Sequence, residues 1–124
     1  MRRLIAAAVI GVILLTLYFT GYFYVTDTCE KTKDLLKECR IAYDQQNNAE
    51  EKAKEINEYW NKKEPMLSIF SSHSKIDDVE EALYCLQIYS NTDEAEIFYE
   101  YHGTVEILIH QLLEDTKPGV HSIL

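Results

Sequence analysis

Four side chains able to bind metal ions or transfer protons recur at four-residue intervals near the C-terminus: His102, Glu106, His110 and Glu114. Residues four apart on a helix are neighbours, and imidazole with carboxylate suits zinc or another divalent cation. A four-residue step drifts by about 40° on a helix of 3.6 residues per turn, so the ends of the row face differently. The zinc-protease pattern H-E-x-x-H is absent. We interpret the row as the polar flank of a helix and keep it only as a candidate metal site.

Two further groups contain residue types found in catalytic or calcium sites. His73 lies between two serines, but a catalytic serine also needs an orienting acid and an oxyanion hole, whereas a capping role between helices explains the same residues. Four acids follow at Asp77, Asp78, Glu80 and Glu81. They lack the loop spacing and central glycine of a calcium loop, and acids are expected in the first turn of a helix. The sequence therefore predicts no enzyme and no cofactor.

Charge is unevenly distributed along the chain, which has 12 basic and 21 acidic residues. Residues 26–75 are almost neutral, whereas residues 76–124 carry eleven acids and one base, Lys117. Such a surface repels nucleic acid and anionic headgroups. It would attract a basic partner or divalent cations, although an acidic surface also simply keeps a domain soluble.

The three cysteines, Cys29, Cys39 and Cys85, are an odd number for an extracytoplasmic domain. Cys29 and Cys39 are ten residues apart on one predicted helix, about 15 Å along its axis, so they cannot pair with each other. A disulfide between Cys39 and Cys85 and three reduced thiols both remain open.

An apolar run from Leu4 to Val25 follows Arg2 and Arg3 and contains no charge. About 20 apolar residues cross a bilayer as a helix, and the arginine pair places the N-terminus in the cytoplasm. A cleaved signal peptide would have a shorter apolar region and small residues at its cleavage site. Here the run ends instead in aromatic residues suited to the headgroup layer: Tyr18, Phe19, Tyr22, Phe23 and Tyr24.

We therefore expect residues 1–26 to form a cytoplasmic arginine pair and an uncleaved signal anchor, and residues 27–124 to form one extracytoplasmic domain. Within the anchor, Ala7 and Gly11 have the spacing of a small-residue motif that would let two spans approach, although small residues are common in such spans. Self-association stays open on this basis.

Helical periodicity dominates the soluble part, and we expect four helices. The first runs from Thr28 to about Asp44, either continuous with the span or restarted by Asp27 and Glu30 as a capping box. Pro65 is expected to kink or interrupt the second. Capping-box spacings predict starts at Asn48 and Ser74, and Thr92 caps the last helix. The expected inward residues are Leu35, Leu36, Cys39, Ala42, Tyr43, Ala49, Ala53, Ile56, Trp60, Lys63, Leu67, Ile76, Val79, Leu83, Leu86, Tyr89, Phe98, Tyr101, His102, Val105, Leu108, Ile109, Leu112 and Leu113.

Short turns between amphipathic helices favour antiparallel neighbours. The predicted fold is therefore all-α: one N-terminal transmembrane helix followed by a small four-helix bundle of two antiparallel hairpins. A tetratricopeptide-like array is the alternative, but such arrays need about three repeats for a stable core. Gly103 in the last helix is expected to mark close packing of another helix. The apolar residues 120–124 are expected to fold back onto the bundle.

The central segment has the pattern W…LS.F..HS.ID..E. With it, essentially the whole chain, anchor included, resembles one uncharacterised family, the domain of unknown function numbered 4363, which comprises short membrane-anchored proteins of Gram-positive, mostly anaerobic spore-forming bacteria. This pattern carries the resemblance. It is matched by Trp60, Leu67, Phe70, His73, Ser74, Ile76, Asp77 and Glu80, with Ser122 and Ile123 matching a closing signature. Pro65 departs from the family pattern. The resemblance implies no activity, and a membrane partner of the multi-pass YetF type at most.

Two hypotheses of function follow. The first is a non-enzymatic accessory module, held at the outer face of the cell membrane to contact another membrane or envelope protein. The second is a cation- or ligand-sensing domain that uses the acidic C-terminal half and the row from His102 to Glu114.

Overall fold

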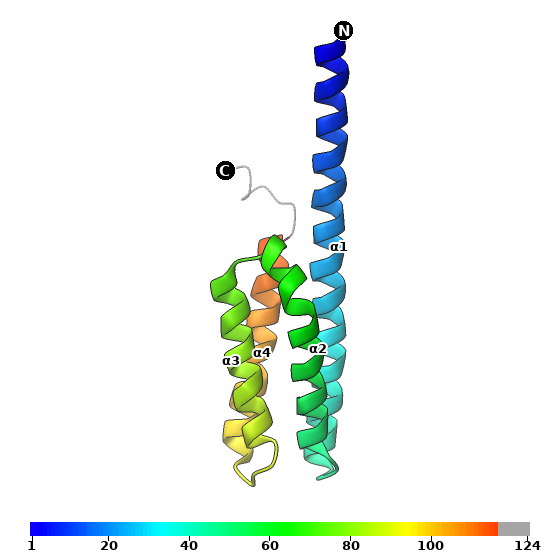
Figure 1. Cartoon of the computed structure of the whole chain (residues 1–124). Coiled ribbons are helices and arrows are strands. Elements are labelled where there is room, and N and C mark those ends of the chain that lie inside the picture. The colour runs from blue at the N-terminus through cyan, green and yellow to red at the C-terminus, as the bar shows by residue number, and fades with distance from the viewer. Residues whose placement is uncertain (117–124) are drawn as a thin grey trace.

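The computed structural model describes residues 1–116, which form four α-helices and no strand: α1 (Arg2–Asp44), α2 (Ala49–Phe70), α3 (His73–Tyr89) and α4 (Ala95–Thr116). Consecutive helices run antiparallel, and α4 returns to pack beside α1 (Figure 1). Each helix contacts two neighbours, in the cyclic order α1, α2, α3, α4. The predicted all-α fold, a long apolar helix followed by a bundle of two helical hairpins, is confirmed.

Helix α1 is continuous, so of the two expected arrangements the first soluble helix is a direct extension of the apolar run. Its first half is long and apolar enough to cross a membrane and is almost entirely exposed. Residues 2–20 rise beyond the bundle by about 28 Å at about 1.5 Å per residue (Figure 1). From Gly21 onward one face is buried every three or four residues, which makes the second half a bundle helix: Gly21, Val25, Thr28, Cys29, Thr32, Leu36, Cys39 and Ala42.

The core lies along the bundle axis and has contributions from all four helices. Trp60 is fully buried, as predicted, and is the largest side chain of the core. The other fully buried large side chains are Phe98, Leu36, Ile56, Leu67, Ile76, Leu83, Leu86, Ile109, Leu112, Val25 and Val79. All but Val25 were expected to face inward, because a period of 3.6 residues identifies the buried stripe of each helix. Six of the expected inward residues are only half-buried: Leu35, Tyr43, Lys63, Tyr89, Tyr101 and Leu108.

Pro65 does not interrupt α2, which runs without a break from Ala49 to Phe70. Proline at this position cannot donate a backbone hydrogen bond to the carbonyl of Asn61. Both residues are exposed, so water can satisfy that carbonyl and the cost of the missing bond is small. The hydroxyl of Ser68 donates to the carbonyl of Glu64 at 2.9 Å, which adds a bond next to the missing one. The predicted interruption is therefore wrong.

The helix starts also differ from the capping boxes expected at Asn48 and Ser74. Asn48 precedes α2 in the left-handed conformation, with φ of 60°, and its side chain makes no capping bond. Helix α3 begins at His73 after Ser72, earlier than the Ser74 start. Thr92 accepts a weak bond of 3.4 Å from the Glu94 amide, and α4 then begins at Ala95. Packing of the apolar faces sets these starts without side-chain caps.

The two helical glycines that can be compared within the bundle have opposite surroundings. A Cβ added at Gly21 would overlap the ring of Phe70, so α1 and the end of α2 touch here because Gly21 has no side chain. A Cβ added at Gly103 would meet no atom within 4 Å. The expectation that Gly103 marks close helix packing is wrong. The segment 120–124, Lys117, Ser122 and Ile123 lie outside the described residues.

Candidate functional site

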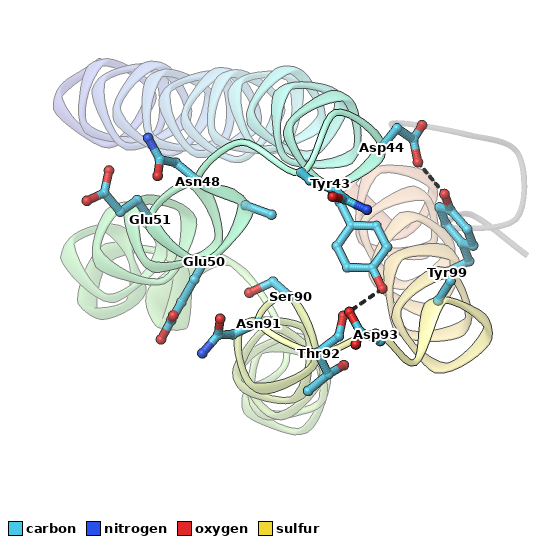
Figure 2. Close-up of a pocket in the computed structure, with 13 residues that line it drawn as sticks. Tyr43, Asp44, Asn48, Glu50, Glu51, Ser90, Asn91, Thr92, Asp93 and Tyr99 are labelled. Carbon is cyan, nitrogen blue, oxygen red and sulfur yellow. Dashed lines mark hydrogen bonds between the residues drawn. The ribbon is translucent and has the colours of Figure 1, made fainter.

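A cavity lies at the end of the bundle farthest from the apolar half of α1, and we call it the distal pocket. It has a volume of about 790 Å³ and opens between the loop that joins α1 to α2 and the loop that joins α3 to α4 (Figure 2). Its lining is polar and includes Tyr43, Asp44, Gln46, Asn48, Ala49, Glu50, Glu51, Ser90, Asn91, Thr92, Asp93, Ala95 and Tyr99.

Two tyrosines of the pocket lining form hydrogen bonds that hold its walls together. The Tyr43 hydroxyl donates to the carbonyl of Thr92 at 3.0 Å, and its ring stacks on Phe98 with centroids 3.8 Å apart (Figure 2). The Tyr99 hydroxyl donates to Oδ1 of Asp44. Both bonds link α1 to the start of α4 or to the loop before it. They hold together two helices that no short turn connects.

The distal pocket is electrostatically negative. Asp44, Glu50, Glu51 and Asp93 line it, and none of the lysine, arginine or histidine side chains of residues 1–116 does. Burial raises the pKa of the Tyr43 phenol, with further contributions from Asp93, Asp44 and Glu94. Carboxylates favour a cationic group through ion pairing. The ring of Tyr99 already has a cation over it, because the guanidinium carbon of Arg40 lies 5.2 Å from the ring centroid. The pocket therefore suits a positively charged side chain or a small cation rather than an anion.

A second constellation lies between α2 and α3, and we call it the acidic trio: Glu64, Asp77 and Glu80. One carboxylate oxygen from each lies within 4.8 Å of the others. Oε1 of Glu80 is buried and has no hydrogen-bond partner among the described residues. Burial, a hydrogen bond with Glu64 and the negative charges of Glu64 and Asp77 raise the pKa of Glu80 to about 7. Oxygen-only ligands at this spacing suit hard cations such as calcium, magnesium or manganese.

The row from His102 to Glu114 separates into two pairs in the structure. His102 is 4% exposed; its Nε2 lies 2.9 Å from the Leu36 carbonyl oxygen and its Nδ1 lies 2.8 Å from Oε1 of Glu106. Both ring nitrogens therefore face oxygen acceptors, which leaves neither lone pair directed at a metal. His110 is exposed and lies 3.8 Å from Glu114. The row brings no four-ligand site together, and His102 instead ties α4 to α1.

The cysteines of the described residues are free thiols, Cys29 and Cys39 buried and Cys85 half-buried. Burial raises the pKa of Cys29 and of Cys39 to about 12, so both stay protonated. The Cys39 thiol lies 3.7 Å from the carbonyl oxygen of Ala49. A protonated, buried thiol is a small apolar core residue and not a reactive one.

The residues of the central motif fall around the hairpin of α2 and α3. Trp60, Leu67 and Ile76 are fully buried, and Phe70 packs on Gly21. His73 and Ser74 are exposed in the first turn of α3, and the pair belongs to no assembled catalytic set among the described residues. Asp77 and Glu80 belong to the acidic trio. The motif thus combines residues that pack the bundle with two of the three carboxylates of the acidic trio.

The sequence did not predict the distal pocket, and it did not predict that Glu64 belongs to the acidic trio. Glu64 and Glu80 each lie eight residues from Ser72 along the chain. In an antiparallel hairpin such residues face each other across the turn, so this spacing was a usable signal. The sequence has no comparable signal for the distal pocket, because the pocket depends on how α4 packs against α1.

The family model described as domain of unknown function (DUF4363) matches residues 19–123 of the chain. The match begins inside the apolar run and includes the whole of the described bundle. Neither the curated proteins nor the solved structures gave a match.

Proposed function

Because the chain belongs to the DUF4363 family, whose description names no activity, we propose a function from its own geometry: a non-enzymatic accessory protein, anchored in the cell membrane by residues 4–25. In this proposal the N-terminus is cytoplasmic and the bundle is extracytoplasmic. The distal pocket docks a positively charged segment of another membrane or envelope protein, for which a multi-pass protein of the YetF type is one candidate.

The single observation that carries the proposal is the distal pocket itself, a cavity of about 790 Å³ lined by four carboxylates and by no basic side chain of the described residues. The residues that line it include the loops after α1 and α3, and these loops lie at the end of the bundle remote from the apolar half of α1 (Figure 1). From Val25 to Asp44, α1 rises about 28 Å at about 1.5 Å per residue. An anchored chain would hold the pocket at this height above the membrane, where it can reach only an extracytoplasmic segment of a partner.

The anchor is supported by the exposed, uncharged and continuous first half of α1. The orientation is supported by Arg2 and Arg3 at one end of the apolar run and by the aromatic cluster at the other. Resistance of the full chain to alkaline carbonate extraction tests the anchor. Protease access to the bundle in intact cells tests the orientation.

The docking proposal is tested with a photo-crosslinking residue at Asn91, which is exposed and lines the distal pocket. We expect crosslinks from native membranes to join Asn91 to a lysine- or arginine-rich segment of one integral-membrane or envelope protein. They should be lost when Asp44, Glu50 and Asp93 are changed to Asn, Gln and Asn together.

A matched triple variant changes the exposed acids Asp34, Asp78 and Glu81 to their amides. It removes the same charge from outside the distal pocket and should keep the crosslinks. Equal loss of the crosslinks in both triple variants would mean that the overall negative charge of the bundle, and not the distal pocket, attracts the partner. A crosslinked segment without positive charge would contradict the docking proposal.

A second function, cation sensing, rests on the acidic trio. One carboxylate oxygen of each residue lies within 4.8 Å of the others, and Oε1 of Glu80 is buried without a hydrogen-bond partner among the described residues. A cation bound there would link α2 to α3 and would displace the proton that Glu80 holds near neutral pH. Calorimetry with calcium, manganese and zinc on the full chain tests this function. No heat at millimolar metal, or equal heat with Glu80→Gln, would refute it.

A further inference from the structure

The turn between α2 and α3 carries apolar side chains that the bundle does not cover. We call residues 66–72 the α2–α3 corner. Ile69 is 70% exposed and Met66 is 45% exposed, both in the last turns of α2. Two large apolar side chains standing in water on one short segment lack the burial that residues of their type usually have. Together they form an apolar patch that the other described residues leave uncovered.

The height of this corner along α1 is fixed by one contact. The ring of Phe70 packs directly on Gly21 of α1. Gly21 precedes the end of the apolar run at Val25 by four residues, which is about 6 Å on a helix. The 22 residues of that run measure about 33 Å, close to the roughly 30 Å of a hydrocarbon core. Gly21, and the corner with it, therefore lies about 6 Å to the membrane side of the end of the run, at the outer edge of the hydrocarbon core.

The surroundings of the corner match that boundary. On α1, Phe23 follows Gly21 by two residues and is 65% exposed, so the helix also presents an apolar side chain to its surroundings at this level. On the α3 side the corner ends in Ser71 and Ser72, and Lys75 follows, paired with Asp115 of α4. Apolar side chains next to hydroxyl and charged groups are the composition of a segment that lies in the interfacial layer. Figure 1 shows the corner beside α1, where the helix leaves the bundle.

We propose that the α2–α3 corner dips into the outer interfacial layer of the lipid bilayer, with Met66 and Ile69 against the acyl chains. The proposal rests on the anchor of the proposed function and adds a second membrane contact to it. Two attachment points restrict the tilt of the bundle about the end of the span. The distal pocket is then held at a defined height instead of swinging on a single helix.

The test places a tryptophan at the corner and asks whether lipid quenches it. Full-length Ile69→Trp is reconstituted into phosphatidylcholine vesicles with ordinary or brominated acyl chains. Ile41→Trp is the matched control, because Ile41 is 55% exposed on α1 near the distal pocket. Trp60 is fully buried, so the unmodified chain gives the background emission. Circular dichroism and flotation of the vesicles confirm folding and anchoring.

We expect bromination to lower the added emission of Ile69→Trp roughly twofold or more, as for an interfacial tryptophan, and to leave Ile41→Trp unchanged. Met66→Trp gives a second measurement at the same corner if Ile69→Trp fails to fold. An emission from both corner variants that bromination leaves unchanged, in chains that float with the vesicles, would overturn the corner proposal and leave the anchor intact. A chain that does not float would overturn the anchor and the corner proposal together.

Discussion

Replacing Glu80 by Gln should stabilise the bundle at pH 8 and have a much smaller effect at pH 5. Glutamine has nearly the shape of a protonated glutamate but cannot ionise. In the acidic trio it removes the one carboxylate whose charge is both partly buried and next to Glu64 and Asp77. The substitution therefore separates the effect of charge from the effect of packing.

The size of the effect follows from the pKa of Glu80, which is raised from 4.5 to about 7. Between these values the folded state keeps a proton that the unfolded state releases, so stability is fully present below about 4.5 and is lost as pH rises through about 7. At about 1.36 kcal/mol per pKa unit the loss is at most about 3.4 kcal/mol. Glu80 is only partly buried, and solvent screening reduces this to about 1–2 kcal/mol.

The assay is thermal unfolding of the full chain in detergent micelles, followed by the fluorescence of Trp60. This single tryptophan is fully buried in the bundle core, so its emission reports the bundle and not the apolar half of α1. In a domain of this size 1 kcal/mol moves the melting temperature by about 4–8 °C. We expect Glu80→Gln to melt higher than the unmodified chain at pH 8, with well under half of that gain at pH 5.

The control is Glu81→Gln, the neighbouring residue on α3, which is exposed and outside the acidic trio. It removes one negative charge from the same helix and should show no comparable dependence on pH. The reasoning fails if Glu80→Gln melts lower at pH 8, or if its gain is the same at both pH values. Either result would mean that Glu80 is ionised without penalty in the folded state.

Two further predictions concern the packing of α1 and the thiols. Gly21→Ala should destabilise the bundle by about 1 kcal/mol, because the new methyl group displaces the Phe70 ring packed against it; Gly103→Ala, whose methyl group meets open space, should stabilise it by about 0.5–1 kcal/mol in the same melting assay. A maleimide should modify the half-buried Cys85 first in the native chain, while Cys29 and Cys39, buried and with pKa values near 12, should react only after unfolding. Equal labelling of all three thiols by mass spectrometry, or equal melting of both glycine variants, would contradict these assignments.

Much of the fold was predictable because the buried apolar residues of each helix recur in the sequence with a period of 3.6 residues. The positions of the turns then set which residues face each other within a hairpin. Asn57 donates to Oε1 of Gln87 at 3.0 Å, and the midpoint of these two residues is Ser72, at the turn between α2 and α3. Glu64 and Glu80 share that midpoint. The acidic trio could therefore have been predicted from the sequence.

Local signals were less reliable because packing overrode them. Pro65 predicted an interruption of α2, yet its freed carbonyl faces water and the helix continues. Asn48 and Ser74 have the spacing of capping boxes, yet neither starts a helix with a side-chain cap. In both cases the tertiary contacts of a long amphipathic helix outweigh the local preference, which is worth about 1 kcal/mol for a cap and about 3 kcal/mol for an internal proline.

The distal pocket could not be predicted from the sequence, because it depends on the contact between the first and last helices. No turn joins α1 to α4, so no midpoint rule relates them. Their register is set by particular side chains: Tyr43 stacked on Phe98, Asp44 accepting from Tyr99, and His102 bonded to the Leu36 carbonyl oxygen. A shift of one helical turn between α1 and α4 would leave every hairpin intact and break all three contacts. The candidate site thus lies at the one interface that helical periodicity and turn positions leave undetermined.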